Sequence, residues 1–237
     1  MNQPLSPLQF VARWRGNTRK ETAAYFDHFN DLCRMVGHPT PNEFRGTEFF
    51  GFQADAAKQG GGNGWADVWF ARRFAIEYKG PHKKLDAAYD QLLLYRESLQ
   101  NPPLLVVSDM ERIIIHTNWT NTVKRVVELS LDDLLTPAGQ QHLHNLFYAP
   151  EAFRSDTTSE QVTKQAAAEF ARLADSLRRW KNPPDQIAHF LIRLLFCLFA
   201  EDVGLLPERI FSRLVAKTQG KTKQFSAALL NWMKFSV

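Results

Sequence analysis

The chain has 237 residues, of which 44% are hydrophobic and 23% are charged, with a formal net charge of +4. This apolar content is sufficient for a packed core and excludes an intrinsically disordered chain. The sequence has no run of about 18 uncharged apolar residues and no signal peptide at its start, which predicts a soluble cytoplasmic protein without a membrane segment. Cys33 and Cys197 are predicted to be buried, reduced thiols rather than a disulfide or a catalytic pair.

The excess positive charge is confined to the second half of the chain. Residues 1–150 hold 16 basic and 16 acidic side chains, whereas residues 151–237 hold 13 basic and 9 acidic ones. A basic balance fits a polyanionic partner such as DNA. The neutral first part is therefore not expected to bind DNA strongly by itself.

The first 80 residues predict two helices and then three strands. Apolar residues at helical spacing indicate helices over residues 5–15 and 18–36, the second ended by Gly37. Strands are expected over residues 48–53, 65–70 and 74–79.

The next 70 residues alternate between helical and strand patterns. A helix over residues 85–99 is followed by strands over 104–107, 112–117 and 122–129, and then by short helices over 131–135 and 137–147. This order predicts an α/β fold in which helices cover both faces of a mixed sheet.

Beyond residue 161 every segment reads as helix. Helices are predicted over residues 163–179, 184–203, 207–216 and 226–235, which gives a domain of residues 1–155 and an all-α segment of residues 156–237. Glu201 and Asp202 are interpreted as a structural end to the second of these helices. The chain stops just after an apolar helix that would need a partner, so we expect it to be truncated.

Three residues between positions 60 and 84 suggest a catalytic site: Asp67, Glu77 and Lys79. Side chains of a strand alternate between its faces, so Glu77 and Lys79 project together while Ile76 and Tyr78 point into a core. Asp67 lies on the preceding predicted strand, just after a glycine-rich run that permits a sharp turn or a close backbone approach. Taken alone, the pattern is more typical of a solvated strand face with Asp67 in a turn, and the glycine run and the following helix favour a site instead.

Two carboxylates and a lysine at one place suit metal-dependent phosphodiester hydrolysis. Asp67 and Glu77 would bind Mg²⁺, a hard cation that prefers oxygen ligands, with the backbone carbonyl of Tyr78 as a third ligand. Lys79 would then steady an attacking water or the charge that develops on phosphorus. Gln91 and Tyr95, at positions i and i+4 of the next helix, would present a polar pair to the same site.

The chain resembles the N-terminal nuclease region of MmeI-like (type IIL) restriction-modification proteins, which carry PD-(D/E)XK motifs. The resemblance extends from Phe10 to about Met233. It rests on Phe-Val-Ala-Arg-Trp at 10–14, His28-Phe29 with Asp31-Leu32-Cys33, Gly-Trp-Ala-Asp-Val-Trp at 64–69, Glu-Tyr-Lys-Gly at 77–80, Leu-Asp-Ala-Ala-Tyr at 85–89, Asn-Pro-Pro-Leu-Leu-Val-Val-Ser-Asp at 101–109, Ile-His-Thr-Asn at 115–118, and Phe-Ala-Glu-Asp-Val-Gly-Leu-Leu-Pro at 199–207.

The resemblance implies roles for individual residues. Asp67, Glu77 and Lys79 match the catalytic positions of the family, and Gln91 and Tyr95 resemble the Gln-x-x-x-Tyr element of related nucleases. Glu21 resembles an acid that some relatives add to the metal site, although a first-turn acid that interacts with the helix dipole explains it as well. Basic side chains around the site would contact DNA phosphates: Lys58, Arg72, Arg73, Lys83 and Lys84.

The resemblance also implies what lies outside these residues. Residues 156–237 would be a helical spacer that joins the nuclease to an adenine-N6 DNA methyltransferase and a target-recognition domain, so S-adenosylmethionine would bind only in that missing part. The expected partner is double-stranded DNA in a bacterial cytoplasm, with transient dimerisation for double-strand cleavage. We expect an isolated fragment to have little activity, because the family couples cleavage to the other domains.

Two other functions stay open. One is a non-catalytic module that keeps the nuclease fold to bind DNA or to act as a scaffold. The other is methyl transfer, suggested by Asn-Pro-Pro at 101–103 and at 182–184. Neither triplet is followed by the aromatic residue that would stack on a flipped base, so these residues do not indicate a methyltransferase.

Overall fold

The structure is a computed structural model that describes residues 4–57, 63–80, 83–203, 205–206, 210–218 and 220–221. The chain divides into two compact units, Met1–Glu160 and Gln161–Val237. The predicted boundary at residue 155 stands close to this division.

The first unit contains one six-stranded sheet with the strand order β1-β2-β3-β4-β5-β6. All neighbouring strands are antiparallel except β3 and β4, which are parallel and are connected through α3. A helical crossover of this kind is what a parallel pair requires. In chain order the elements are α1 (Pro7–Trp14), α2 (Glu21–Val36), β1 (Phe50–Ala57), β2 (Asn63–Phe70), β3 (Phe74–Tyr78), α3 (Leu85–Tyr95), β4 (Leu104–Ser108), β5 (Arg112–Thr117), β6 (Val126–Ser130), η1 (Asp133–Leu135), α4 (Pro137–Tyr148) and η2 (Pro150–Phe153).

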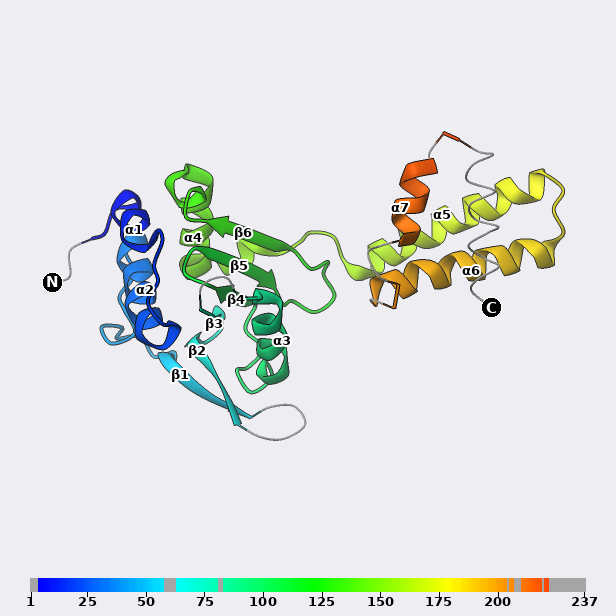
Figure 1. The fold of residues 1–237 in the computed structure, drawn as a ribbon. Coiled ribbons are helices and arrows are strands. Elements are labelled where there is room, and N and C mark those ends of the chain that lie inside the picture. The colour runs from blue at the N-terminus through cyan, green and yellow to red at the C-terminus, as the bar shows by residue number, and fades with distance from the viewer. Residues whose placement is uncertain are drawn as a thin grey trace. The chain divides into compact units, whose positions relative to one another are not determined.

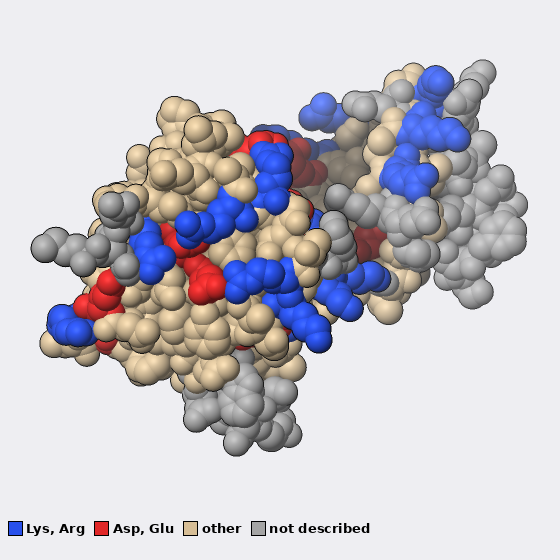
Figure 2. Space-filling model, turned by 60° about the vertical axis from the view of Figure 1, so that its left-hand side comes forward, with Lys and Arg blue, Asp and Glu red and all other residues tan. Residues whose placement is uncertain are grey.

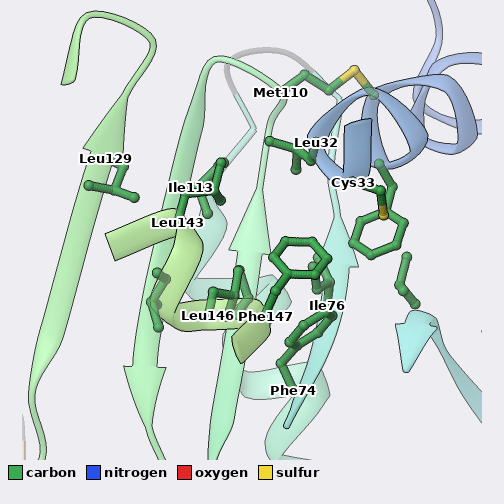
Figure 3. Close-up of a cluster of buried hydrophobic side chains, with 14 of the residues drawn as sticks. Leu32, Cys33, Phe74, Ile76, Met110, Ile113, Leu129, Leu143, Leu146 and Phe147 are labelled. Atoms are coloured by element: carbon green, nitrogen blue, oxygen red, sulfur yellow. The ribbon is translucent and has the colours of Figure 1, made fainter. Parts of the chain in front are cut away.

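Helices cover both faces of this sheet (Figure 1). On one face α1, α2 and α4 pack over Phe74 and Ile76 of β3, in a core shown in Figure 3. On the other face α3 buries Leu92 and Tyr95 against Ala75 of the same strand. The alternation along β3 therefore sends its two sets of side chains into two different cores, and the predicted α/β fold with a mixed sheet between helices is confirmed.

Several element boundaries differ from the predicted ones. α3 ends at Tyr95 rather than at residue 99, and residues 96–100 form turns before Gln100 and Asn101, both with positive φ, lead to Pro102. β1 continues to Ala57, because residues 54–57 pair with residues 63–66 of β2 in a long hairpin. The predicted strand over 122–129 is instead β6, Val126–Ser130.

The described part of the second unit is helical, as predicted. It contains α5 (Ser159–Arg179), α6 (Pro184–Asp202) and α7 (Ile210–Thr218), while the predicted helix over 226–235 lies outside the described residues. Glu201 accepts hydrogen bonds from the backbone and hydroxyl of Ser212, which agrees with its predicted structural role. Cys33 and Cys197 are both free and buried, as predicted. Within the described chain, no helix is both long and apolar enough to cross a bilayer.

Candidate active site

Asp67 and Glu77 lie where the β2–β3 ladder ends. The last paired residues there are Val68 and Ile76, so Asp67 and Glu77 occupy the next positions of the two strands. Instead of a further ladder bond, the backbone N–H of Tyr78 donates to Oδ2 of Asp67 at 2.7 Å. A hairpin with this register thus brings the two predicted carboxylates together where β2 and β3 stop pairing, near the end of β3.

Glu77 is buried and holds hydrogen bonds at both of its carboxylate oxygens. Lys79 Nζ donates to Oε1 at 2.8 Å, and the Tyr95 hydroxyl donates to Oε2 at 2.9 Å. Lys79 Nζ also lies 3.2 Å from Oε1 of Gln91. The four side chains Glu77, Lys79, Gln91 and Tyr95 therefore form one polar network between β3 and α3.

The local sequence explains this network. Glu77 and Lys79 follow Ala75 on the face of β3 that α3 covers, and Ala75 is small enough for the helix to approach closely. Gln91 and Tyr95 stand one turn apart on α3, so both reach the same strand end. The alternative of a solvated strand face is wrong for Glu77, whose exposure is only 4%.

Burial makes this site unfavourable for negative charge. Desolvation, followed by repulsion from Glu77, raises the pKa of Asp67 to about 7, against the hydrogen bond from Tyr78. Desolvation also raises the pKa of Glu77, although Lys79 opposes that shift. Two partly desolvated carboxylates, of which only Glu77 is paired directly with a lysine, provide a place where an added cation would be stabilised.

Glu21 lies close to this site but on a different element. It is the first residue of α2, and its Oε2 would lie 3.9 Å from a Cβ added to Gly80. Its charge contributes to the raised pKa values of Asp67 and Glu77. Its place in the first turn of α2 also agrees with the helix-dipole interpretation.

The oxygen donors suit a hard cation such as Mg²⁺, but the protein supplies few of them. Across the described ranges, no three His, Cys, Asp or Glu side chains come together closely enough to bind a metal ion by themselves. Asp67, Glu77 and the carbonyl of Tyr78 would have to be completed by water or by phosphate oxygens. Mg²⁺ sites are commonly built this way, with one or two carboxylates and several waters.

The five basic residues predicted to contact DNA have different environments. Arg72 is exposed and lies 3.8 Å from Glu48, and Lys83 and Lys84 are exposed beside the start of α3. Lys58 lies outside the described residues. Arg73 is half-buried, packs over the ring of Phe70 and donates to the carbonyl of Phe147, so the alternative of a solvated rim residue does not hold for it.

Charges of both signs alternate on the face of the first unit that is visible in Figure 2. Basic and acidic side chains lie next to one another there, in keeping with the balanced charge of residues 1–150. The electrostatic attraction of this unit for DNA is therefore expected to be local rather than spread over that face.

Tyr25 of α2 was not predicted from the sequence. Its side chain is 3% exposed and its hydroxyl has no hydrogen-bond partner in the described part of the chain. Burial, and then the charges of Asp67, Glu21 and Glu77, raise its pKa to about 12. The sequence contained one indication that Tyr25 lies near the site. It follows Glu21 by four residues and therefore shares a helix face with it.

Two protein-family models match consecutive parts of the chain. Residues 5–179 match the family described as "MmeI, N-terminal domain", and residues 185–234 match "MmeI, helicase spacer domain". Comparison with curated proteins gave no match. One solved structure, "cryoEM structure DrdV-DNA complex", is similar with 14% sequence identity and a TM-score of 0.41, over 72% of this chain and 15% of that chain. Since the first family match alone covers more than half of its residues, the chain belongs to the MmeI family and carries the N-terminal domain and the helicase spacer domain of that family.

Proposed function

We propose that residues 1–160 are the DNA-cleavage domain of a type IIL restriction-modification protein and hydrolyse phosphodiester bonds with the help of Mg²⁺. The observation that carries this proposal is the position of Lys79. Its ammonium group is held between Oε1 of buried Glu77 and Oε1 of Gln91, next to Asp67, whose pKa is raised to about 7. A buried cluster with this composition costs stability and is typical of a functional site.

Each residue of the site has a separate proposed role. Asp67, Glu77 and the Tyr78 carbonyl would hold Mg²⁺, which supplies Lewis-acid stabilisation of charge on the phosphate when bound. Lys79 orients the attacking water or stabilises the charge that develops on phosphate oxygens. Gln91 and Tyr95 hold Lys79 and Glu77 in place, so they act through those two residues rather than on the phosphate.

DNA would reach the site along exposed basic residues. Lys83 and Lys84, which follow β3, would contact phosphates near the site, whereas Arg72 lies in the β2–β3 turn at the other end of β3 and would contact DNA farther away. Such contacts give register and affinity rather than sequence choice. Target recognition and adenine methylation would belong to other parts of the whole protein. We accordingly expect this chain alone to cut DNA slowly.

Metal binding by this chain tests the proposal directly. Mn²⁺ takes the same oxygen ligands as Mg²⁺, and its electron paramagnetic resonance signal reports the free ion during a titration. We expect one site in the wild-type chain that is lost in Asp67→Asn. A wild-type chain that binds double-stranded DNA but no Mn²⁺ would instead support the non-catalytic scaffold.

Cleavage by the whole protein provides the second test. Lys79→Ala in a full-length protein that contains this domain should reduce cleavage by roughly 100-fold or more, because it removes charge stabilisation at the phosphate. Methylation of the same DNA serves as the control for intact folding and target binding. Unchanged cleavage would remove Lys79 from the proposed mechanism.

A further inference from the structure

The hydroxyl of Tyr25 is a buried donor without a hydrogen-bond partner in the described chain, and it lies within electrostatic reach of Asp67, Glu21 and Glu77. Tyr25 belongs to α2, whose first residue is Glu21, and its ring centroid lies 5.8 Å from that of Tyr78. Tyr78 in turn donates its backbone N–H to Asp67. The tyrosine is therefore anchored beside the strand end that carries the candidate site.

An unsatisfied buried hydroxyl is unfavourable for folding. Tyrosine hydroxyls usually find a hydrogen-bond partner when buried, since burial removes the water that would otherwise bind them. Gln53 of β1 lies near enough to influence the Tyr25 hydroxyl without meeting hydrogen-bond geometry. Phenylalanine would pack among the same aromatic neighbours, Phe26, Phe52 and Tyr78, without this cost.

Asp67 offers a complementary acceptor. Its Oδ2 accepts the N–H of Tyr78, while its second oxygen accepts no hydrogen bond from the described residues. The negative charge of Asp67 raises the pKa of the Tyr25 hydroxyl, and the charges of Glu21 and Glu77 do the same. A buried donor without a partner and a carboxylate oxygen with room to accept are suited to hold a small polar species between them.

We propose that Tyr25 is a positioning residue of this site, whose hydroxyl donates a hydrogen bond to the water or phosphate oxygen that Asp67 also contacts. This inference rests on the proposed metal-dependent function. Tyr25 approaches from α2, on the sheet face opposite the one from which α3 presents Gln91 and Tyr95. The site is thus supported from both layers of the fold. The hydroxyl stays protonated and acts only as a donor.

The test compares two tyrosine-to-phenylalanine variants of the 237-residue chain. Tyr25→Phe removes the unpartnered hydroxyl, whereas Tyr148→Phe removes a hydroxyl that donates to the carbonyl of Gly37 away from the site. We expect Tyr25→Phe to raise the dissociation constant for Mn²⁺ roughly 10-fold, the size seen for residues that orient metal ligands. Its urea midpoint without metal should equal or exceed that of the wild type. Tyr148→Phe should leave Mn²⁺ binding unchanged.

Two results would overturn the inference while leaving the proposed function intact. The first is wild-type Mn²⁺ affinity in Tyr25→Phe when Asp67→Asn no longer binds the ion. The second is a lower metal-free urea midpoint in Tyr25→Phe, which would show that the hydroxyl has a structural partner. Absence of Mn²⁺ binding by the wild-type chain would overturn both the inference and the metal-dependent function.

Discussion

Asp67 accepts a hydrogen bond from the backbone N–H of Tyr78 at the point where the two strands that carry them cease to pair. One carboxylate oxygen thereby replaces a backbone acceptor of the sheet. The hydrogen bond from Tyr78 to Asp67 therefore fixes the position of the Asp67 carboxylate relative to the end of the β2–β3 pairing. It also holds the negative charge of Asp67 in a partly desolvated position beside Glu77.

Asp67→Asn should stabilise the metal-free protein at alkaline pH. The folded pKa of Asp67 is raised from 3.8 to about 7, so its favourable contribution is full below pH 3.8 and is lost as pH rises through about 7. At about pH 8 the variant should be more stable by roughly 1–4 kcal/mol, with little difference near pH 4. Urea denaturation over this pH range measures the effect. A variant that is less stable than the wild type at pH 8 would contradict it.

Lys79→Met should destabilise the fold as well as affect cleavage. It leaves the buried carboxylate of Glu77 without its ammonium partner 2.8 Å away, and the expected loss is about 1–3 kcal/mol at neutral pH. The double variant Glu77→Gln with Lys79→Met should recover part of this loss, because no unpaired charge then stays buried. Additive effects of the two substitutions would show that the pair is not coupled.

Tyr95→Phe should reduce stability where Tyr25→Phe does not. The Tyr95 hydroxyl donates to Oε2 of Glu77 in a buried position, and loss of a hydrogen bond to a charged group costs about 1–2 kcal/mol. Tyr148→Phe is the matched control, since Tyr148 is 43% exposed and its removal should change stability by less than about 0.5 kcal/mol. Equal denaturation midpoints for Tyr95→Phe and the wild type would exclude a contribution from this bond.

His28 should make the protein sensitive to acid. It is buried between Phe10, Trp14 and Tyr78, and desolvation lowers its pKa from 6.5 to about 3. The stability gained from the neutral ring is full above pH 6.5 and is lost as pH falls toward 3. From about pH 7.5 to about pH 5 the loss should be about 2 kcal/mol.

His28→Phe provides the control for this pH effect. It removes the contacts of the ring with the Tyr78 hydroxyl and the carbonyl of Met110, so we expect lower stability at neutral pH. The loss between pH 7.5 and 5 should nevertheless become smaller, because the titrating group is gone. An unchanged pH dependence of unfolding would assign the acid sensitivity to other residues.

Local patterns in the sequence were sufficient for most of the architecture. Alternation along β3 predicted which of its side chains enter a core, and helical spacing predicted that Gln91 and Tyr95 share a face of α3. The ends of elements were less predictable. After α3 ends, Gln100 and Asn101 adopt positive φ, a conformation that non-glycine residues adopt at a cost and only where the surroundings require it, and no local pattern predicted this.

The sequence by itself determined the mixed α/β order, the helical second half, and the identity of Asp67, Glu77 and Lys79 as candidates, because strand and helix periodicities depend on neighbouring residues. Only the tertiary structure decided that Glu77 is buried, that Arg73 packs inward, and that Tyr25 of α2 comes close enough to Asp67 of β2 for that charge to raise its pKa. These features depend on which elements pack together across the sheet. Desolvation and charge proximity, and hence the raised pKa values, arise from contacts between residues far apart in the chain.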